Sequence, residues 1–274
     1  MVATSALPCS YSKAWSPSDD ANLYAWYNQT GLGSTGADQT TWADQSGNSR
    51  DLSESGSVNP TISSTLVNGL KGVKFVTDSG MSRSSFIDID GQDFLIACLF
   101  TDTAGDLESS TVVFDIDAPS TGYGLFYTNF LGFILGSTIG KDSGTVQVNS
   151  GDAHNEMFGT NGVGPGVVMV MHRNGDTVTV TINGIQLSQF TESVTSTGND
   201  AFYLGSYSGI QNESASTTNY ETVVMLGDSI PDSTRKAVEG YLSHKFARHA
   251  RIKSLANTNT HKYRKAQPWG RGKS

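Results

Sequence analysis

Residues 167–187 are VVMVMHRNGDTVTVTINGIQL, and their pattern is typical of three consecutive antiparallel β-strands. The continuous apolar run Val167–Met171 suits a strand that is buried on both faces. The alternation in Thr177–Ile182 places three apolar residues on one face of a strand and three threonines on the other. The dipeptides Asn174-Gly175 and Asn183-Gly184 tolerate positive φ and are expected to form two tight turns. The segment therefore predicts a three-stranded meander within an antiparallel sheet.

The rest of the chain has the composition of an all-β domain. Its 274 residues include 30 glycines, and Gly, Ser, Thr, Asn and Asp separate short apolar stretches. Short strands with many turns indicate a sandwich or barrel, and such domains often reach about 200–250 residues. Further strands are expected at residues 23–27, 72–76, 94–101, 111–115, 124–135, 202–206 and 221–226.

One helix is expected near the C-terminal end, after a start signal at residues 231–233. Val238, Leu242 and Phe246 recur at i, i+4 and i+8, which gives the helix one apolar face. Gly240 inside it costs about 0.5–1 kcal/mol relative to alanine. Its expected compensation is a close approach of the helix to a sheet.

Charge is divided unevenly along the chain. Residues 235–274 hold 11 of the 18 Lys and Arg residues and a single acid, Glu239, so they carry +10. Residues 1–234 hold 7 bases and 25 acids and carry −18, which gives the net charge of −8. A chain polarised in this way usually combines an acidic body with a basic arm.

The predicted order is an extended N-terminal arm (1–20), one β-sandwich domain (21–247) and a basic C-terminal arm (248–274). The C-terminal arm is expected to bind neighbouring subunits, because opposite charges steer association and aromatic residues anchor interfaces. Nucleic acid is the weaker candidate, since an acidic body repels phosphates. The residues expected to contact another subunit are Arg248, Arg251, Lys253, Lys262, Tyr263, Arg264, Lys265, Trp269, Arg271 and Lys273.

No targeting or membrane segment is expected. Residues 1–8 have neither the basic group nor the apolar region of a signal peptide, and no stretch approaches the ~20 apolar residues of a membrane span. The protein is therefore expected to be soluble and made in a cytoplasm. Cys9 and Cys98 are expected to be reduced thiols, although the sequence alone leaves a disulfide between them open.

Three segments form a recognisable combination. The first is WADQSGN at residues 42–48, which fits the pattern W-x-D-x-S-G-N. The second lies in residues 60–75, with Pro-Thr, Asn-Gly-Leu and Gly-Val-Lys-Phe in that order, and the third is VEGYLSHKF at residues 238–246. Over residues 20–247 the chain resembles concanavalin A-like, laminin-G-like lectin domains, which are common in bacterial and bacteriophage proteins.

The resemblance implies a jelly-roll sandwich of two antiparallel sheets with one short C-terminal helix. One interpretation of Trp42 and Asp44 is a sugar-stacking pair, but a core anchor and a turn residue are the favoured interpretation. The motif residues that the resemblance assigns to the fold are Trp42, Asp44, Ser46, Gly47, Asn48, Gly69, Phe75, Glu239, Gly240, Tyr241, Leu242 and Lys245.

The leading functional hypothesis is a non-enzymatic structural protein of a bacteriophage particle, either an external capsid decoration or cement protein or a tail component. It follows from the lectin-like fold, the missing export signal and the two arms, which add interface without enlarging the core. The virion is then the expected location, and the major capsid protein, other virion proteins and further copies of the chain are the expected partners. The alternative is a carbohydrate-binding lectin-like module for a cell-surface glycan, and the third hypothesis is a glycosidase of the same fold.

No catalytic residue is predicted. A retaining glycosidase needs two carboxylates about 5–5.5 Å apart, and the seven glutamates are widely separated in the sequence. Asp115 and Asp117 have the i, i+2 spacing, as do Asp88 and Asp90, but loop or calcium-adjacent acids are favoured. No cofactor is expected. Oxygen-rich loops leave a structural calcium ion open, although residues 88–91 do not match an EF-hand loop.

Overall fold

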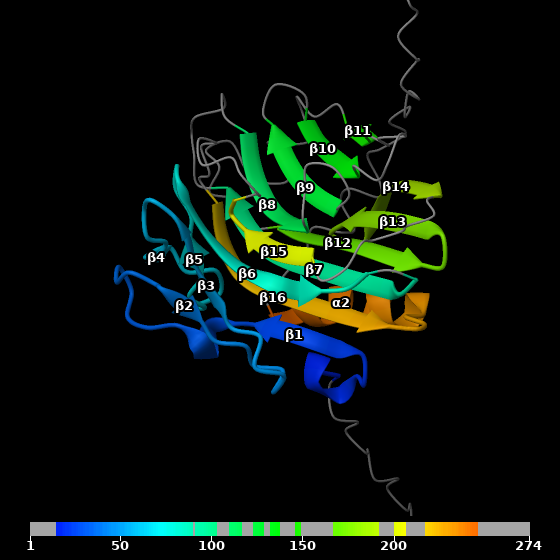
Figure 1. Cartoon of the computed structure of the whole chain (residues 1–274), viewed down its shortest axis with the longest axis horizontal. Helices are drawn as coiled ribbons and strands as arrows, with labels where there is room; N and C mark the ends of the chain where they lie inside the picture. Colours follow the sequence, from blue (N-terminus) through cyan, green and yellow to red (C-terminus); the bar gives the residue numbers. More distant parts are fainter. Residues whose placement is uncertain are drawn as a thin grey trace, which may run out of the picture.

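The computed structural model of the chain is a two-layer β-sandwich (Figure 1). Sheet A has the strand order β14-β13-β12-β7-β16-β5-β4, with β1 also paired to β16, and sheet B has the order β11-β10-β9-β8-β15-β6-β3-β2. The strand pairs are antiparallel, as the predicted jelly-roll sandwich requires. The structure describes residues 15–89, 91–102, 110–116, 123–128, 132–137, 146–148, 167–191, 200–206 and 217–245.

The elements have the following bounds. Sheet A contains β1 (Leu23–Tyr27), β4 (Thr61–Ile62), β5 (Val73–Lys74), β7 (Asp93–Asp102), β12 (Val167–Asn174), β13 (Thr177–Ile182), β14 (Ile185–Thr191) and β16 (Thr217–Gly227). Sheet B contains β2 (Thr41–Trp42), β3 (Leu52–Gly56), β6 (Ser79–Ile87), β8 (Ser110–Ile116), β9 (Tyr123–Thr128), β10 (Gly132–Ser137), β11 (Val146–Val148) and β15 (Asp200–Leu204). The helices are η1 (Pro17–Asp19), η2 (Gln29–Gly31) and α2 (Asp232–Lys245). Among the residues that the structure describes, no helix is long and apolar enough to cross a membrane.

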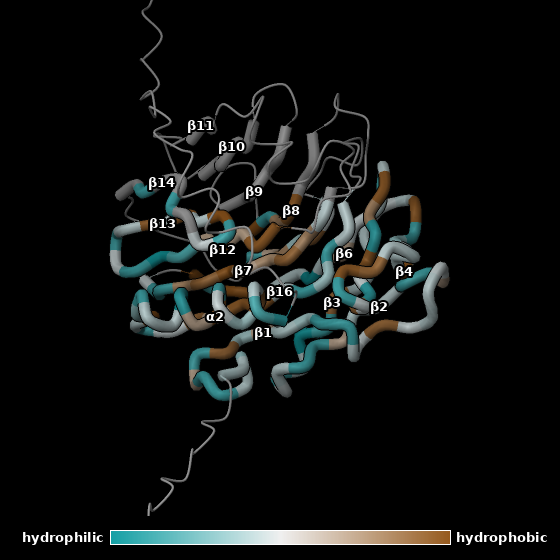
Figure 2. Tube along the Cα trace, turned by 180° about the vertical axis from the view of Figure 1, so that it is seen from behind, coloured by the Kyte–Doolittle hydropathy of each residue, from teal (hydrophilic) through white to brown (hydrophobic). Residues whose placement is uncertain are grey.

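Strand β7 has a continuous apolar sequence because both of its faces are covered. Phe94, Ile96 and Cys98 lie in the core between the sheets, whereas Leu95 and Ala97 lie in a second apolar cluster that includes α2. All five side chains are fully buried, and Figure 2 shows hydrophobic colour along this strand. Strand β12 divides its residues between the two clusters in the same way, as its apolar run predicts.

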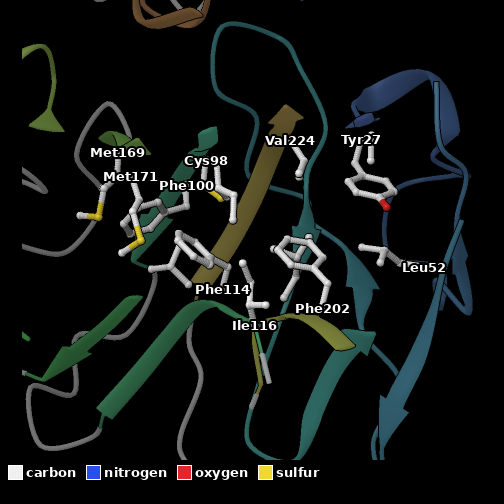
Figure 3. Close-up of a cluster of buried hydrophobic side chains, with 14 of the residues drawn as sticks. Tyr27, Leu52, Cys98, Phe100, Phe114, Ile116, Met169, Met171, Phe202 and Val224 are labelled. Atoms are coloured by element: carbon white, nitrogen blue, oxygen red, sulfur yellow. The ribbon is translucent and has the colours of Figure 1, made fainter. Parts of the chain in front are cut away.

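Aromatic and sulfur-containing side chains fill the space between the sheets. Phe114 of sheet B lies beside Phe100 and Met171 of sheet A (Figure 3). Phe86 stacks on Phe202 with 4.7 Å between the ring centroids. This contact joins neighbouring strands of sheet B and contributes about 0.5–1.5 kcal/mol beyond the buried area of the two rings.

Cys98 is a free thiol inside this core. Burial raises its pKa to about 12, so the thiol stays protonated at neutral pH. Cys98 agrees with the predicted reduced state, and Cys9 lies outside the described residues.

Helix α2 lies on the outer face of sheet A (Figure 1). Val238 and Leu242 are fully buried against β7 and β12, which confirms the predicted apolar face, and Phe246 lies outside the described residues. The predicted close approach at Gly240 is wrong. Gly240 is exposed, and a Cβ added there would meet no atom within 4 Å.

The substitution Gly240→Ala should therefore stabilise the protein. Glycine in the middle of a helix costs about 0.5–1 kcal/mol relative to alanine, and the open space gives no opposing penalty. Urea unfolding should show a higher midpoint with an unchanged m value. A lower midpoint would mean that the glycine has a role beyond the helix.

The predicted meander is confirmed, with one shift in a turn. β12, β13 and β14 pair consecutively, and Asn183 and Gly184 form the second turn with φ of 50° and 79°. Asn174 still belongs to the ladder, so the first turn consists of Gly175 and Asp176. Gly175 alone of these two has a positive φ, of 60°.

Sheet B was harder to predict than sheet A. The single strand expected at residues 124–135 is two strands, β9 and β10, which pair with each other. Strands β2, β3, β6 and β11 of sheet B were not expected, and neither was β4 of sheet A. In β6, Met81 and Phe86 face the core, but serines separate them and Ser85 has a φ of 51°, so the apolar alternation is interrupted.

The domain begins earlier than the predicted boundary at residue 21. Trp15 packs edge-on against Tyr241 with 6.0 Å between the ring centroids, and Pro17 is buried. Residues 15–20 therefore belong to the domain. The remainder of the predicted arms, with every residue expected to contact another subunit, lies outside the described residues.

Candidate functional site

The WADQSGN motif caps the outer edge of β1, the edge that does not pair with β16. The backbone N–H of Trp26 donates to Asp44 Oδ1 at 2.9 Å, and its carbonyl accepts from the N–H of Gln45 at 2.7 Å. The side-chain amide of Asn48 donates to the carbonyl of Tyr24 at 3.0 Å. An edge strand with unsatisfied backbone groups is a template for pairing with another chain. The motif removes that template.

Asp44 is the centre of this cap. Besides the N–H of Trp26, its carboxylate accepts from the N–H and hydroxyl of Ser46, at 2.9 and 2.7 Å, and from the N–H of Arg50 at 3.1 Å. Arg50 in turn lies over the ring of Tyr24, 3.6 Å from its centroid. Asp44 thus acts as the turn residue that the sequence predicts.

Trp42 is a core anchor, as favoured from the sequence. Its side chain is fully buried, and its Nε1–H donates to the carbonyl of Asn28 at 2.9 Å. The ring is therefore not available to stack on a sugar. Gly47 has a φ of 88°, which a residue with a side chain rarely adopts, and this turns the loop back toward Asn48.

Tyr241 and Lys245 attach α2 to a buried carboxylate. Glu221 on β16 is 1% exposed and accepts from Tyr241 Oη at 2.9 Å, Lys245 Nζ at 2.8 Å and Trp26 Nε1 at 2.7 Å. Burial, followed by the charge of Glu221, raises the pKa of Tyr241, so its hydroxyl remains a donor. The conspicuous Tyr and Lys of the closing helix therefore maintain its position on the sheet.

Glu239 makes a second polar link between α2 and sheet A. Its carboxylate accepts from Arg235 Nη1 at 2.8 Å and from the hydroxyl of Thr181 on β13. Arg235 also pairs with Asp232 at 2.6 Å, at the start of the helix.

Gly69 and Phe75 also serve the fold. Gly69 has a φ of 76° in a turn with Asn68, whose side-chain amide donates to the carbonyl of Lys245 at 2.9 Å. Phe75 is buried against Gly205, where an added Cβ would lie 2.2 Å from the ring. The predicted motif residues therefore do not meet in one binding site but stabilise separate parts of the sandwich.

The outer face of sheet B carries a row of polar side chains that spans five strands. On each strand at least one residue next to the row is buried in the core between the sheets, so the row itself lies on the opposite, outer side. The pairing register aligns them side by side. This polar row consists of Thr41 on β2, Ser53 on β3, Ser82 on β6, Tyr203 on β15 and Asp115 on β8.

Small residues surround Tyr203 on this face. Ala201 precedes it on the outward side of β15, and Ser55 Oγ lies 3.4 Å from Ser206 Oγ farther along the sheet. At Gly80 an added Cβ would lie 2.1 Å from Ser206 Oγ, so glycine permits this contact. Tyr203 itself is half-buried. It is therefore the one large side chain among the described outward residues of β3, β6 and β15.

The acids considered for catalysis are only partly described. Asp115 is fully buried at one end of the polar row, and its predicted partner Asp117 lies outside the described residues, as does Asp90. Within the described part of the chain, no group of three His, Cys, Asp or Glu side chains could hold a metal ion.

His172 is a packed residue beneath α2. It is 3% exposed, and its Nε2 lies 2.7 Å from the carbonyl of Ile230. Because a carbonyl only accepts hydrogen bonds, Nε2 carries the proton. Burial, outweighing this hydrogen bond, lowers the pKa of His172.

This lowered pKa predicts a loss of stability in acid. In the unfolded chain the imidazole of His172 titrates near pH 6.5. Below that pH it binds more protons in the unfolded chain than in the folded protein, so the free energy of unfolding falls. His172→Gln should keep a donor toward Ile230 and reduce the loss between pH 7 and pH 5. Urea unfolding of both proteins at the two pH values measures this difference. Equal losses would contradict the assignment to His172.

No protein-family model and no curated protein matches the sequence. Several solved structures share the fold. The binding domain of botulinum neurotoxin DC, in complex with SialylT, aligns with a TM-score of 0.56 at 9% identity, over 83% of this chain and 52% of that one. The chain thus spans about half the length of the toxin domain. A Trypanosoma rangeli sialidase in complex with sialic acid aligns with a TM-score of 0.54 at 14% identity, over 82% and 33% of the two chains.

A third similar structure is aligned with this chain over almost the whole length of that structure. Domain 4 of AbnA, an extracellular GH43 arabinanase from Geobacillus stearothermophilus, aligns with a TM-score of 0.56 at 16% identity, over 79% of this chain and 98% of that one. That domain is in complex with arabinotriose. At these identities the likenesses establish the lectin-like jelly-roll fold.

Proposed function

We propose that the protein is a carbohydrate-binding module and that the outer face of sheet B around Tyr203 binds the glycan. The observation that carries this proposal is the polar row, in which the one aromatic residue, Tyr203, is paired with Ser82 on one side and with Asp115 on the other. A tyrosine ring offers an apolar surface for the C–H face of a sugar, and serine hydroxyls can both donate to and accept from sugar hydroxyls.

The comparisons support this class of ligand over a structural role. The arabinanase domain has nearly the same extent as this sandwich and is in complex with an oligosaccharide. Binding without catalysis is the simpler proposal for this chain. The acid pair that a glycosidase would need includes Asp115, whose carboxyl group is buried away from solvent.

Tyr203→Ala should weaken glycan binding by about tenfold or more, equivalent to ~1.4 kcal/mol, because it removes the stacking surface. Tyr203→Phe keeps the ring and should retain most of the affinity. A glycan array that includes arabinotriose, followed by calorimetric titration of the best ligand, measures both effects.

Lys74→Ala provides the matched control. Lys74 lies on β5 between two core residues, so it belongs to the outer face of sheet A. Its substitution should leave the affinity unchanged. Equal binding by wild type and Tyr203→Ala, with both proteins folded, would place the binding site elsewhere.

The role as a bacteriophage structural protein remains a second proposal. It rests on the division of charge between residues 1–234 and 235–274, which suits docking of the basic segment on an acidic neighbour. Co-sedimentation of the full chain with phage particles would test it.

A further inference from the structure

We infer that the Tyr203 face selects neutral glycans over glycans that carry carboxylate or sulfate groups. The inference rests on the proposed function and adds the class of ligand to it. In the described part of this face, the polar row and its small neighbours supply hydroxyl groups and the carboxyl group of Asp115, and no cationic side chain. Proteins usually hold an anionic group with a guanidinium, an ammonium or a helix N-terminus.

The basic residue nearest the face is directed away from it. Arg83 follows Ser82 on β6, on the side of the strand opposite the polar row. Its Nη1 donates to the carbonyls of Ser49 and Asp51, at 3.0 and 3.3 Å. The guanidinium therefore braces the loop that follows the edge cap.

Other basic side chains of the acidic body are engaged elsewhere. Arg50 lies over the ring of Tyr24, and Lys71 Nζ donates to the carbonyl of Gly33 at 2.7 Å. Lys74 belongs to the outer face of sheet A. Each of these cations is therefore used by the fold or lies on another surface.

The buried Arg173 is also occupied by hydrogen bonds within the fold, since its Nη1 donates to the carbonyls of Ile89 and Gln92, both at 3.1 Å. The two other bases of residues 1–234, Lys13 and Lys141, lie outside the described residues. The cations of α2 lie on the outer face of sheet A, across the sandwich from the polar row.

The surrounding charge acts in the same direction. Residues 1–234 carry −18, so the field of the body disfavours the approach of an acidic ligand. Neutral sugars bring no charge into this field. Their binding should also depend little on salt, because screening affects charged pairs.

The test is an array of neutral glycans beside acidic forms of the same glycans. The probes are arabinotriose, chitotriose, lactose and N-acetyllactosamine, with sialylated and sulfated forms of the last two. We expect binding to neutral members, at least about tenfold weaker binding to any acidic form, and less than about a twofold change in neutral binding between 50 and 500 mM NaCl.

A pair of variants tests the cause of the selectivity. Ser82→Arg places a cation beside Tyr203 and should increase binding of the sialylated and sulfated forms. Ser82→Gln adds comparable bulk without charge and should not. If wild type binds acidic forms as well as or better than neutral ones, the inference is wrong while the proposed function stands. If no probe binds, or if Tyr203→Ala leaves all binding unchanged, both are wrong.

Discussion

Asp44→Ala should lower the free energy of unfolding by about 2–4 kcal/mol. The carboxylate accepts hydrogen bonds from the backbone N–H groups of Trp26, Ser46 and Arg50, and alanine leaves all three without that acceptor. Each buried N–H that loses its partner costs about 1–3 kcal/mol, and water can replace part of this loss because Asp44 is only half-buried. Chemical denaturation at pH 7 measures the change.

The same substitution should also change how the protein associates. Without the cap, the Tyr24 and Trp26 edge of β1 presents backbone donors and acceptors to other chains. Sedimentation should then show association that increases with protein concentration. Asp228→Ala is the matched control, since Asp228 is exposed, and its effect should stay within about 0.5 kcal/mol. A monomeric Asp44→Ala protein of normal stability would contradict the capping role.

Strands β7 and β12 of sheet A could be predicted because both of their faces are covered. In β7 and β12, burial between the sheets and beneath α2 demands apolar residues at consecutive positions, and such runs are visible in a sequence. The outer side of β6 is serine, and its alternation is broken at Ser85. The sequence signal for sheet B was correspondingly weak.

The roles of the motif residues could be predicted only in part. The sequence identified Trp42 and Asp44 as structural, but their partners, Asn28 and Trp26, are separated from them along the chain by 14 and 18 residues. The apolar face of the closing helix could be predicted from its periodicity. The role of Glu221 as the acceptor for Tyr241 and Lys245 could not, because no local sequence pattern distinguishes this glutamate.

The candidate binding face was missed for a related reason. The polar row joins residues from five strands, and Ser82 and Tyr203 are neighbours only through the pairing of β6 with β15. The sequence gives each of these residues in isolation, and register between distant strands is set by the buried faces rather than by the exposed one. Ser53 and Ser55 on β3 and Ser82 and Ser84 on β6 stand at alternate positions, and this spacing is the signal in the sequence for an outward polar face.

Lys245→Met should lower the free energy of unfolding by about 3–5 kcal/mol, because it leaves a buried carboxylate without its cation. Glu221 is 1% exposed, so its charge cannot be solvated in place of the ion pair with Lys245 at 2.8 Å. Trp26 and Tyr241 would still donate hydrogen bonds to it, but they do not neutralise the charge. Chemical denaturation at pH 7 gives the comparison with wild type.

Two further variants separate the buried charge from a general effect on α2. Lys236→Met removes an exposed lysine of the same helix, whose pair with Asp232 is open to solvent, and should cost no more than about 1 kcal/mol. Adding Glu221→Gln to Lys245→Met removes the uncompensated charge while keeping an acceptor for Trp26 and Tyr241. The double variant should therefore be more stable than Lys245→Met alone, which a double-mutant cycle measures directly. The cycle also includes the single variant Glu221→Gln. If the stability losses of Lys245→Met and Glu221→Gln simply add in the double variant, the cost of Lys245→Met arises from lost packing of the lysine stem and not from an isolated charge at Glu221.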